Sequence, residues 1–209
     1  MRNSRVRFGA PTFREGKTPN LARTLTEEIL SAARAGKPGA LREVYDLMAP
    51  SILAYLAGKG CEDPEALMQE VLLTVFGKLG TLTGGPAGLR TFAFSVAHAR
   101  MVDDVRRRER QPAFTEFQPH GDNRVTASAE EAVLGSGPGV AAILEGLTPD
   151  QQEVLLLRIV ADLSIGESAR IMDRSEGAVK QLQGRALKLL KDRMERKEAE
   201  GNGQQVARV

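Results

Sequence analysis

Five polar side chains of one predicted helix have the chemistry to bind nucleic acid. They lie on the side of the helix away from its apolar residues, and they are Lys180, Gln181, Gln183, Arg185 and Lys188. Amide and guanidinium groups form hydrogen bonds with base edges, whereas ammonium and guanidinium groups neutralise phosphates. This helix surface therefore indicates DNA binding, and a solvated helix face in an ordinary bundle is the alternative.

The charge of the surrounding sequence supports the DNA-binding interpretation. Residues 145–176 contain three basic and seven acidic residues, a net charge of −4, whereas residues 180–197 contain seven basic and two acidic residues, a net charge of +5. An acidic support that presents a basic helix concentrates the attraction for phosphate on the element that would enter a major groove.

Two capped helices are predicted to position these side chains. Ser164 and Glu167 have the spacing of a capping box, so a helix is expected to begin near Ser164. Residues 173–174 end this helix, and Ser175 caps the next one. The buried sides are assigned to apolar residues at helical spacing: Ala169, Ile171, Met172, Val179, Leu182, Ala186, Leu189 and Leu190. Residues 147–190 are thus predicted to form a helix-turn-helix.

Glycine and proline divide the N-terminal half into helical segments. In order, these are a helix from near Thr26, a second after a break at 36–39, a third from Asp63-Pro64 to about Leu79, a loop over 80–88, and a long helix from near Leu89 past Arg108. In the long helix, Phe92, Val96, Ala99 and Val102 share one apolar face.

The composition is typical of an all-α protein with two helical domains. The chain has 209 residues, enough for two domains that each bury a core of their own, and it shows no convincing strand pattern. Pro, Gly, Ser and acidic residues without periodicity mark a flexible linker. The expected order is a flexible basic arm (1–24), a helical domain (25–110), the linker (111–139), a helix-turn-helix domain (140–197) and a flexible tail (198–209).

Several classes of protein are disfavoured by what the sequence lacks. Cys61 is the only cysteine and there are two histidines, so we expect no internal disulfide, no metal site and no cofactor. The apolar run Val154–Leu157 is closed by Arg158, no apolar run in the chain is long enough for a bilayer, and we expect no secretory segment. Asp103 and Asp104 point apart on their helix, and no nucleophile has a base beside it. We therefore expect a cytoplasmic protein with no catalytic residues and no membrane contact.

Two sets of motifs resemble bacterial RNA polymerase sigma factors of the extracytoplasmic-function class. Residues 63–71 (DPEALMQEV), 89–92 (LRTF) and 102–107 (VDDVRR) are similar to sigma domain two. Residues 147–155 (LTPDQQEVL), 163–169 (LSIGESA) and 175–180 (SEGAVK) are similar to sigma domain four. The motifs follow the family order, with a linker between the two sets.

This resemblance implies a subunit of RNA polymerase that recognises promoters and melts DNA. Core RNA polymerase would be bound through Gln69, Glu70 and Leu73. The minus-ten element and its phosphates would be bound by Phe92, Arg100, Arg106, Arg107, Arg108 and Arg110. The minus-thirty-five element would be bound by Ser175, Lys180, Gln181, Arg185 and Lys188. The implied partners are core RNA polymerase and promoter DNA, duplex and melted, and an anti-sigma factor is a further candidate.

The sequence departs from the family pattern at four positions. Phe92 stands where Trp is usual and Ala66 where an acidic residue is common, while Ala99 and Gly184 replace a frequent Asn and His. Gly184 lowers helix propensity by about 1 kcal/mol. The sequence does not identify which residues near Gly184 contact bases. The alternative function is a helix-turn-helix regulator or an interaction protein that acts without core polymerase; such a regulator would dimerise on palindromic half-sites.

Overall fold

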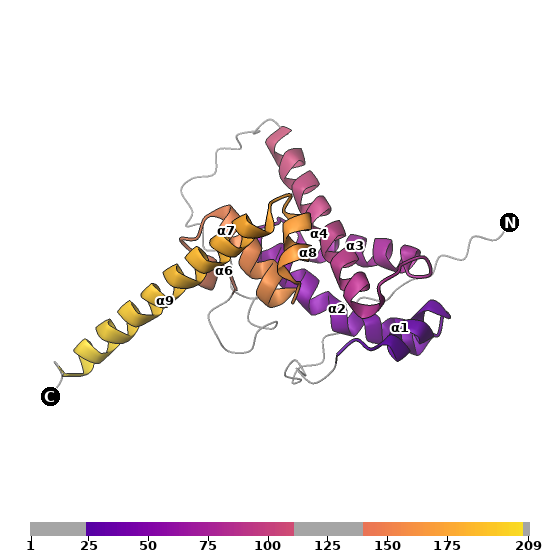
Figure 1. Ribbon diagram of the computed structural model, residues 1–209, viewed down its shortest axis with the longest axis horizontal. Helices are drawn as coiled ribbons and strands as arrows, with labels where there is room; N and C mark the ends of the chain where they lie inside the picture. Colours follow the sequence, from indigo (N-terminus) through magenta and orange to yellow (C-terminus); the bar gives the residue numbers. More distant parts are fainter. Residues whose placement is uncertain (1–23, 111–139, 207–209) are drawn as a thin grey trace, which may run out of the picture.

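The computed structural model describes residues 24–110 and 140–206, and every element in these two ranges is helical (Figure 1). The expected all-α fold is confirmed for these residues. The predicted linker and nearly all of the predicted basic arm lie outside the described residues. The N-terminal range contains α1 (Glu27–Arg34), α2 (Pro38–Gly58), α3 (Pro64–Lys78) and α4 (Gly85–Arg110).

Capping residues set the starts of α1 and α3, as the sequence predicted. Thr26 Oγ1 accepts a hydrogen bond of 3.3 Å from the Ile29 amide, and Asp63 Oδ1 accepts one of 2.9 Å from the Ala66 amide. Pro64 occupies the first position of α3, where a helix has no internal partner for an N–H group. Each start therefore has a local cause in the sequence.

Helix α4 begins at Gly85, earlier than the predicted start near Leu89. Gly84 and Gly85 have φ angles of 84° and 61°, and the Gly88 amide donates to the Gly84 carbonyl at 2.9 Å. A Cβ atom at position 88 would lie 2.2 Å from the Thr83 carbonyl oxygen, so glycine is required there. The second part of the predicted loop is therefore the tightly packed first turn of α4.

The buried face of α4 differs from the apolar face predicted for this helix. Its buried apolar side chains are Leu89, Ala93, Phe94, Ala97 and Met101. Of the predicted face, Ala99 is exposed, and the other members are only half buried against the core: Phe92, Val96 and Val102. The prediction was wrong because apolar residues occur on more than one side of this helix, and periodicity alone did not choose between them.

The C-terminal range contains α6 (Val140–Leu144), α7 (Pro149–Leu155), the π-helical turn η1 (Leu156–Val160), α8 (Ile165–Ile171) and α9 (Glu176–Val206). The predicted capping box of α8 is confirmed. The Glu167 amide donates to Ser164 Oγ at 3.2 Å, and the Ser164 amide donates to Glu167 Oε2 at 2.7 Å. Helix α9 continues to Val206, into the stretch 198–209 that was expected to be a flexible tail.

Helices α8 and α9 pack against each other as the predicted helix-turn-helix. On α9, Val179 and Ala186 are buried, and Leu182 and Leu190 are half buried against the core. Leu189 was expected in this buried stripe but is 42% exposed. Leu189 and Leu190 lie three and four residues after Ala186, so helical periodicity allows either one in the stripe, and the packing of α9 buries Leu190 more than Leu189.

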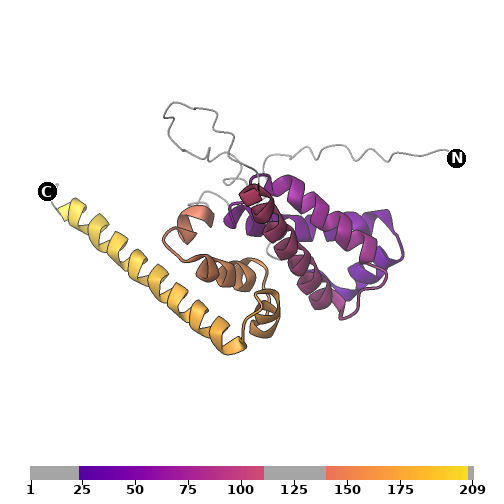
Figure 2. The ribbon, with the colours of Figure 1, turned by 90° about the horizontal axis from the view of Figure 1, so that it is seen from above.

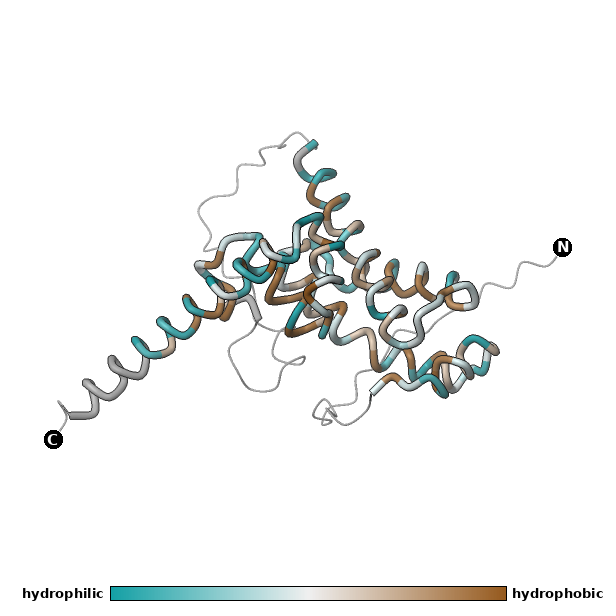
Figure 3. Tube along the Cα trace, in the orientation of Figure 1, coloured by the Kyte–Doolittle hydropathy of each residue, from teal (hydrophilic) through white to brown (hydrophobic). Residues whose placement is uncertain are grey.

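The two halves of the chain pack against each other. Helix α2 contacts α6 and η1, and α4 contacts α8. Figure 2 shows α7 and α8 between α9 and the N-terminal helices. Hydrophobic residues gather in the middle of the molecule, whereas hydrophilic and hydrophobic stretches alternate along the coloured part of α9 (Figure 3). The buried apolar residues of both halves form one cluster, in place of the two separate cores expected from the sequence.

Candidate nucleic-acid interface

The basic surface of the C-terminal half lies on α9, which projects from the body of the molecule (Figure 1). The side chains of Lys180, Gln181, Arg185 and Lys188 are exposed on this helix, while Val179 is buried on its other side. The predicted minus-thirty-five residues on α9 are therefore all accessible. A projecting helix with basic and amide groups on its free side has the shape and charge to enter a major groove.

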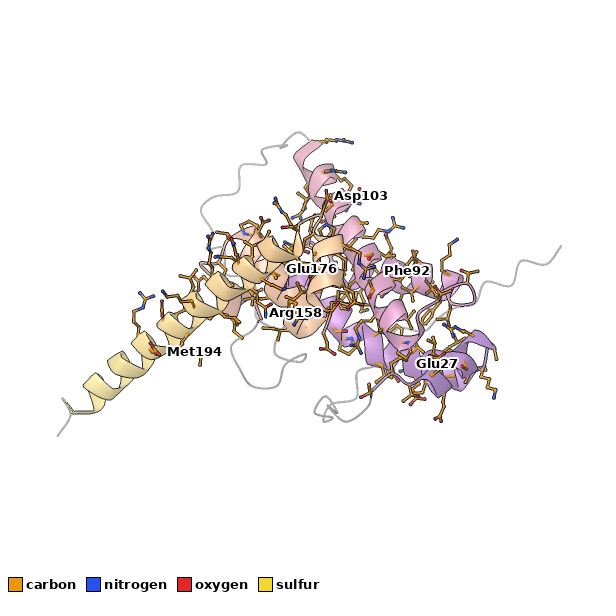
Figure 4. All side chains as sticks on the ribbon, in the orientation of Figure 1. Glu27, Phe92, Asp103, Arg158, Glu176 and Met194 are labelled. Carbon is orange, nitrogen blue, oxygen red and sulfur yellow. The ribbon has the colours of Figure 1, made fainter. Side chains whose placement is uncertain are left out.

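The turn before α9 fixes where this helix begins. Asp173 has a φ of 50°, and Arg174 forms an ion pair with Asp150 of α7 at 3.0 Å. Ser175 Oγ then accepts a hydrogen bond of 3.2 Å from the Ala178 amide, which caps α9 as predicted. Ser175 is exposed at this N-terminal end of α9, where Figure 4 labels the next residue. Backbone amides at a helix N-terminus attract phosphate.

A second basic surface lies at the C-terminal end of α4. Arg106, Arg107 and Arg110 line a hollow of about 460 Å³ together with Asp103, which Figure 4 labels near the projecting end of α4. Three guanidinium groups outnumber one carboxylate, so the hollow has a net positive charge. Such a surface suits the phosphates of a nucleic-acid strand.

Asp104 pairs with Arg107 of this hollow and with the neighbouring Arg108. It is buried, and its carboxylate forms ion pairs with Arg107 at 2.6 Å and Arg108 at 3.2 Å. Arg108 also donates to the Gly60 carbonyl at 3.4 Å, so its guanidinium is directed toward the fold. Asp103 is exposed, so the two consecutive aspartates point apart as the sequence predicted.

The remaining predicted site residues lie on α3 and the middle of α4. On α3, Gln69 and Glu70 are exposed and Leu73 is 66% exposed. Arg100 Nε of α4 is 3.8 Å from Glu70 Oε2, which places the two predicted surfaces side by side. Phe92 is half buried against the core. An exposed leucine beside an amide and a carboxylate suits a protein partner better than a nucleic acid.

Sequence analysis missed a polar cluster between the two halves. Glu153 of α7 is only 4% exposed, and its carboxylate is contacted by three residues of the N-terminal half. Tyr55 Oη donates a short hydrogen bond to Oε1, His98 Nδ1 lies 3.0 Å from Oε1, and Lys59 Nζ lies 2.5 Å from Oε2. We call Glu153, Tyr55, Lys59 and His98 the Glu153 cluster.

These contacts determine the protonation of the cluster. Burial alone would raise the pKa of Glu153, but the interactions with His98, Lys59 and Tyr55 outweigh burial and lower this pKa to about 2. Burial, followed by the charge of Glu153, raises the pKa of Tyr55 well above its usual value. At neutral pH, a buried carboxylate is thus held by a neutral phenol and an ammonium group.

The described residues contain no candidate metal centre. No three His, Cys, Asp or Glu side chains in 24–110 or 140–206 are grouped so that they could hold a metal ion. Cys61 is buried, and burial raises the pKa of its thiol to about 11. No helix within 24–110 or 140–206 is long and apolar enough to span a bilayer.

Comparisons with known proteins cover both halves of the chain. A family model described as "Sigma-70, region 4" matches residues 140–190. The ECF RNA polymerase sigma factor SigF of Caulobacter vibrioides is 32% identical over 168 residues, which are 77% of this chain and 89% of that protein. The ECF RNA polymerase sigma factor BldN of Streptomyces coelicolor is 29% identical over 167 residues. This match covers 78% of the chain, which spans 63% of the length of BldN.

A solved structure has a similar fold. The structure of CnrH in complex with the cytosolic domain of CnrY superposes with a TM-score of 0.53 and 21% sequence identity. The likeness covers 82% of this chain and 97% of that chain, so it extends beyond either half alone. The fold of this chain therefore has a counterpart among solved structures.

Proposed function

Because the chain belongs to the family of ECF RNA polymerase sigma factors, we propose that it directs core RNA polymerase to promoters and helps to open the DNA there. Residues 25–110 act on the polymerase and the minus-ten element, residues 140–197 bind the minus-thirty-five element, and residues 111–139 link them. The protein performs no covalent chemistry itself and works in the cytoplasm.

The observation that carries this proposal is the exposed basic surface of α9. Lys180, Gln181 and Arg185 are positioned to reach base edges and phosphates, and Lys188 extends the positive charge along the helix. A Cβ atom at Gly184 would meet nothing within 4 Å, so the glycine leaves open space on this helix. Ser175 contributes at the N-terminal end, where helix amides favour a phosphate.

The end of α4 is assigned to the opened minus-ten element. Arg106, Arg107 and Arg110 bind its phosphates in the hollow that they line, and Arg100 extends this track toward α3. The partly exposed ring of Phe92 offers a stacking surface to an unpaired base. Arg108 supports this surface from the side of the fold, because its guanidinium lies 3.2 Å from the Asp104 carboxylate and 3.4 Å from the Gly60 carbonyl oxygen.

The free side of α3 is assigned to core polymerase. Leu73 supplies an exposed apolar contact, and Gln69 and Glu70 supply polar groups beside it. An anti-sigma factor is a further proposed partner, since CnrH was solved with the cytosolic domain of CnrY.

Transcription in vitro tests the proposal. The purified full chain is added to core RNA polymerase with a library of promoter fragments, and we expect initiation from a subset of fragments that core polymerase alone does not use. Initiation from no fragment, together with no binding to core polymerase in gel filtration, contradicts the proposal. Dimeric binding to a palindromic site without polymerase supports the alternative of an independent regulator.

The docking surface is tested separately. Glu70→Lys reverses the charge on the free side of α3 and is expected to weaken core binding at least about tenfold, since like charge at an interface costs several kcal/mol. Glu62→Lys makes the same charge change at an exposed position just before α3 and serves as the control. If the two variants bind core polymerase with equal affinity, the free side of α3 is not the surface that binds it.

A further inference from the structure

The Glu153 cluster joins the two halves of the molecule through a buried charge. The carboxylate comes from α7, whereas its three partners come from the N-terminal half: Tyr55 on α2, Lys59 at its end, and His98 on α4. The Lys59 side chain is 11% exposed and that of Glu153 is 6% exposed. A carboxylate this deeply buried is stable only while its partners are present. The cluster therefore ties the charge of Glu153 to one arrangement of the two halves, and loss of a single partner is costly.

A second line of contacts joins α4 to the helix-turn-helix. Arg90 forms an ion pair of 2.8 Å with Asp162, and Thr91 Oγ1 donates a short hydrogen bond to Glu167. Arg90 and Thr91 directly precede Phe92, which we assign to the minus-ten element. Asp162 and Glu167 thus accept hydrogen bonds from Arg90 and Thr91, which lie at the edge of the proposed DNA surface of α4.

The packed form is too compact to bind both promoter elements at the same time. Positions minus ten and minus thirty-five are 25 base pairs apart, which at 3.4 Å per base pair is about 85 Å of duplex. In the structure, α4 and α8 are in direct contact. The 29 residues of 111–139 can span roughly 100 Å when fully extended. The length of residues 111–139 therefore permits the two halves to reach both promoter elements, whereas the contacts between the halves hold them too close together.

We propose that the Glu153 cluster is a latch that keeps this sigma factor in a closed form, and that the latch must open before both promoter elements are bound. This inference rests on the proposed function. In the closed form, Glu153 is buried against Tyr55, Lys59 and His98. Asp162 and Glu167 accept hydrogen bonds from Arg90 and Thr91, the two residues before Phe92. Opening returns the four cluster residues to water, where each is solvated separately.

The closed form lowers the apparent affinity for a promoter in which both elements must be bound. Only the open fraction is competent to span both elements, so apparent affinity falls in proportion to that fraction. Loss of the latch is expected to increase the open fraction and the apparent affinity together, up to the point where nearly all molecules are open.

A distance measurement tests the latch without polymerase. Spin labels are attached at Lys78→Cys on α3 and Met194→Cys on α9, both exposed positions, in a chain that also carries Cys61→Ser. Glu153→Gln removes the charge from the C-terminal half, and Lys59→Met removes the ammonium from the N-terminal half. Each is expected to lower the closed-to-open ratio at least about tenfold, because a buried charge loses its partner.

A matched control separates the latch from a general loss of charge. Asp150→Asn also neutralises a carboxylate of α7, but Asp150 is paired with Arg174 inside the C-terminal half and both are about half exposed. This variant is expected to keep the wild-type distance distribution. Circular dichroism shows which latch variants keep their helicity and are therefore folded. If Glu153→Gln does not fold, Lys59→Met alone tests the cluster. Wild-type distances in the folded latch variants overturn the proposal.

Initiation at limiting protein concentration tests the consequence. The latch variants are expected to need several-fold less protein than wild type for half-maximal initiation, while Asp150→Asn resembles wild type. Variants that open but gain nothing in initiation overturn the inhibitory role of the latch. If even the wild-type protein initiates nowhere, the proposed function fails, whereas the distance measurement still reports whether the Glu153 cluster holds the halves together.

Discussion

The exposed side chains of α9 provide the most direct test at the scale of single residues. Lys180→Ala and Arg185→Ala each remove one positive group from the proposed DNA surface and leave its buried residues unchanged. Each is expected to weaken binding of the minus-thirty-five element by the holoenzyme, with a loss of about 1–3 kcal/mol if the side chain contacts a base. Footprinting of the upstream element measures this loss.

A control for these variants lies in the other half of the chain. Arg42→Ala also removes one positive charge, but Arg42 is on α2 and pairs with Asp46 at 2.9 Å. Its footprint is expected to equal that of wild type because an exposed pair contributes little to stability. If Lys180→Ala and Arg185→Ala give the same footprint as Arg42→Ala, α9 does not read the upstream element.

Cys61 should be nearly inert toward thiol reagents in the folded protein. Burial, supported by the nearby negative charge of Asp104, raises the pKa of the thiol to about 11. At pH 8 about a thousandth of the thiol is then ionised, and the thiolate is the reactive species. We expect slow alkylation by iodoacetamide at pH 8 and fast alkylation in denaturant. Equal rates under both conditions would falsify this assignment of a protected thiol.

The site residues differ in how well the sequence predicts them. Lys180 and Arg185 could be placed because amphipathic periodicity assigns one side of a helix to solvent, and the structure exposes both. The partners of Glu153 could not be placed in the same way. Tyr55 is 98 residues from Glu153 in the chain, and no local pattern relates the two positions.

At the scale of elements, helix starts were predictable where one residue determines them. Ser164 and Glu167 exchange hydrogen bonds, and Asp63 accepts one from the Ala66 amide. Each pair is three residues apart, so local sequence is sufficient. The start of α4 was not predictable, since it depends on how closely Gly88 approaches the Thr83 carbonyl. A close backbone contact of this kind forms only in the folded chain. In the sequence it is marked only by a glycine, which also occurs in loops.

Two helical glycines are predicted to respond oppositely to alanine. Gly184→Ala on α9 adds a Cβ that meets nothing within 4 Å, so it is expected to raise the free energy of unfolding by up to about 1 kcal/mol through helix propensity. Gly88→Ala on α4 places its Cβ 2.2 Å from the Thr83 carbonyl oxygen, and we expect a loss of about 1–3 kcal/mol through overpacking.

Urea unfolding followed by circular dichroism distinguishes these two effects. The midpoint is expected to rise for Gly184→Ala and to fall for Gly88→Ala, with slopes that remain similar to wild type. A fall in both midpoints contradicts the open space found at Gly184, and an unchanged midpoint for Gly88→Ala contradicts the close approach in the first turn of α4.

At the scale of the whole molecule, the contact between the halves is the feature that sequence analysis did not predict. Hydrophobic periodicity indicated which residues are buried, but it did not indicate that α2 packs on η1 or α4 on α8. Apolar residues such as Leu156 and Leu157 lie in the same buried cluster as Leu56 and Phe94. Their sequence pattern is equally compatible with two separate cores, so the arrangement depends on the folded surfaces.

Acid is predicted to open the molecule through Glu153. Burial alone would raise the pKa of this carboxyl, but the interactions with His98, Lys59 and Tyr55 lower it from 4.5 to about 2 in the closed form. A carboxyl released into water binds a proton more readily than the closed one. Its stabilisation of the closed form is therefore complete above about pH 4.5 and is lost as the pH falls toward about 2.

The spin-label distances measure this effect directly. Between pH 6 and pH 4, the contribution of Glu153 to the closed-to-open ratio is expected to fall about fourfold, given these two pKa values. Glu153→Gln cannot titrate at this position, so it should lose this part of the pH dependence. The pKa of Glu167 is lowered in the same direction, because its hydrogen bonds from Ser164 and Thr91 outweigh burial, and this group remains in the variant. Identical pH profiles for wild type and Glu153→Gln would show that the buried carboxylate does not control closure.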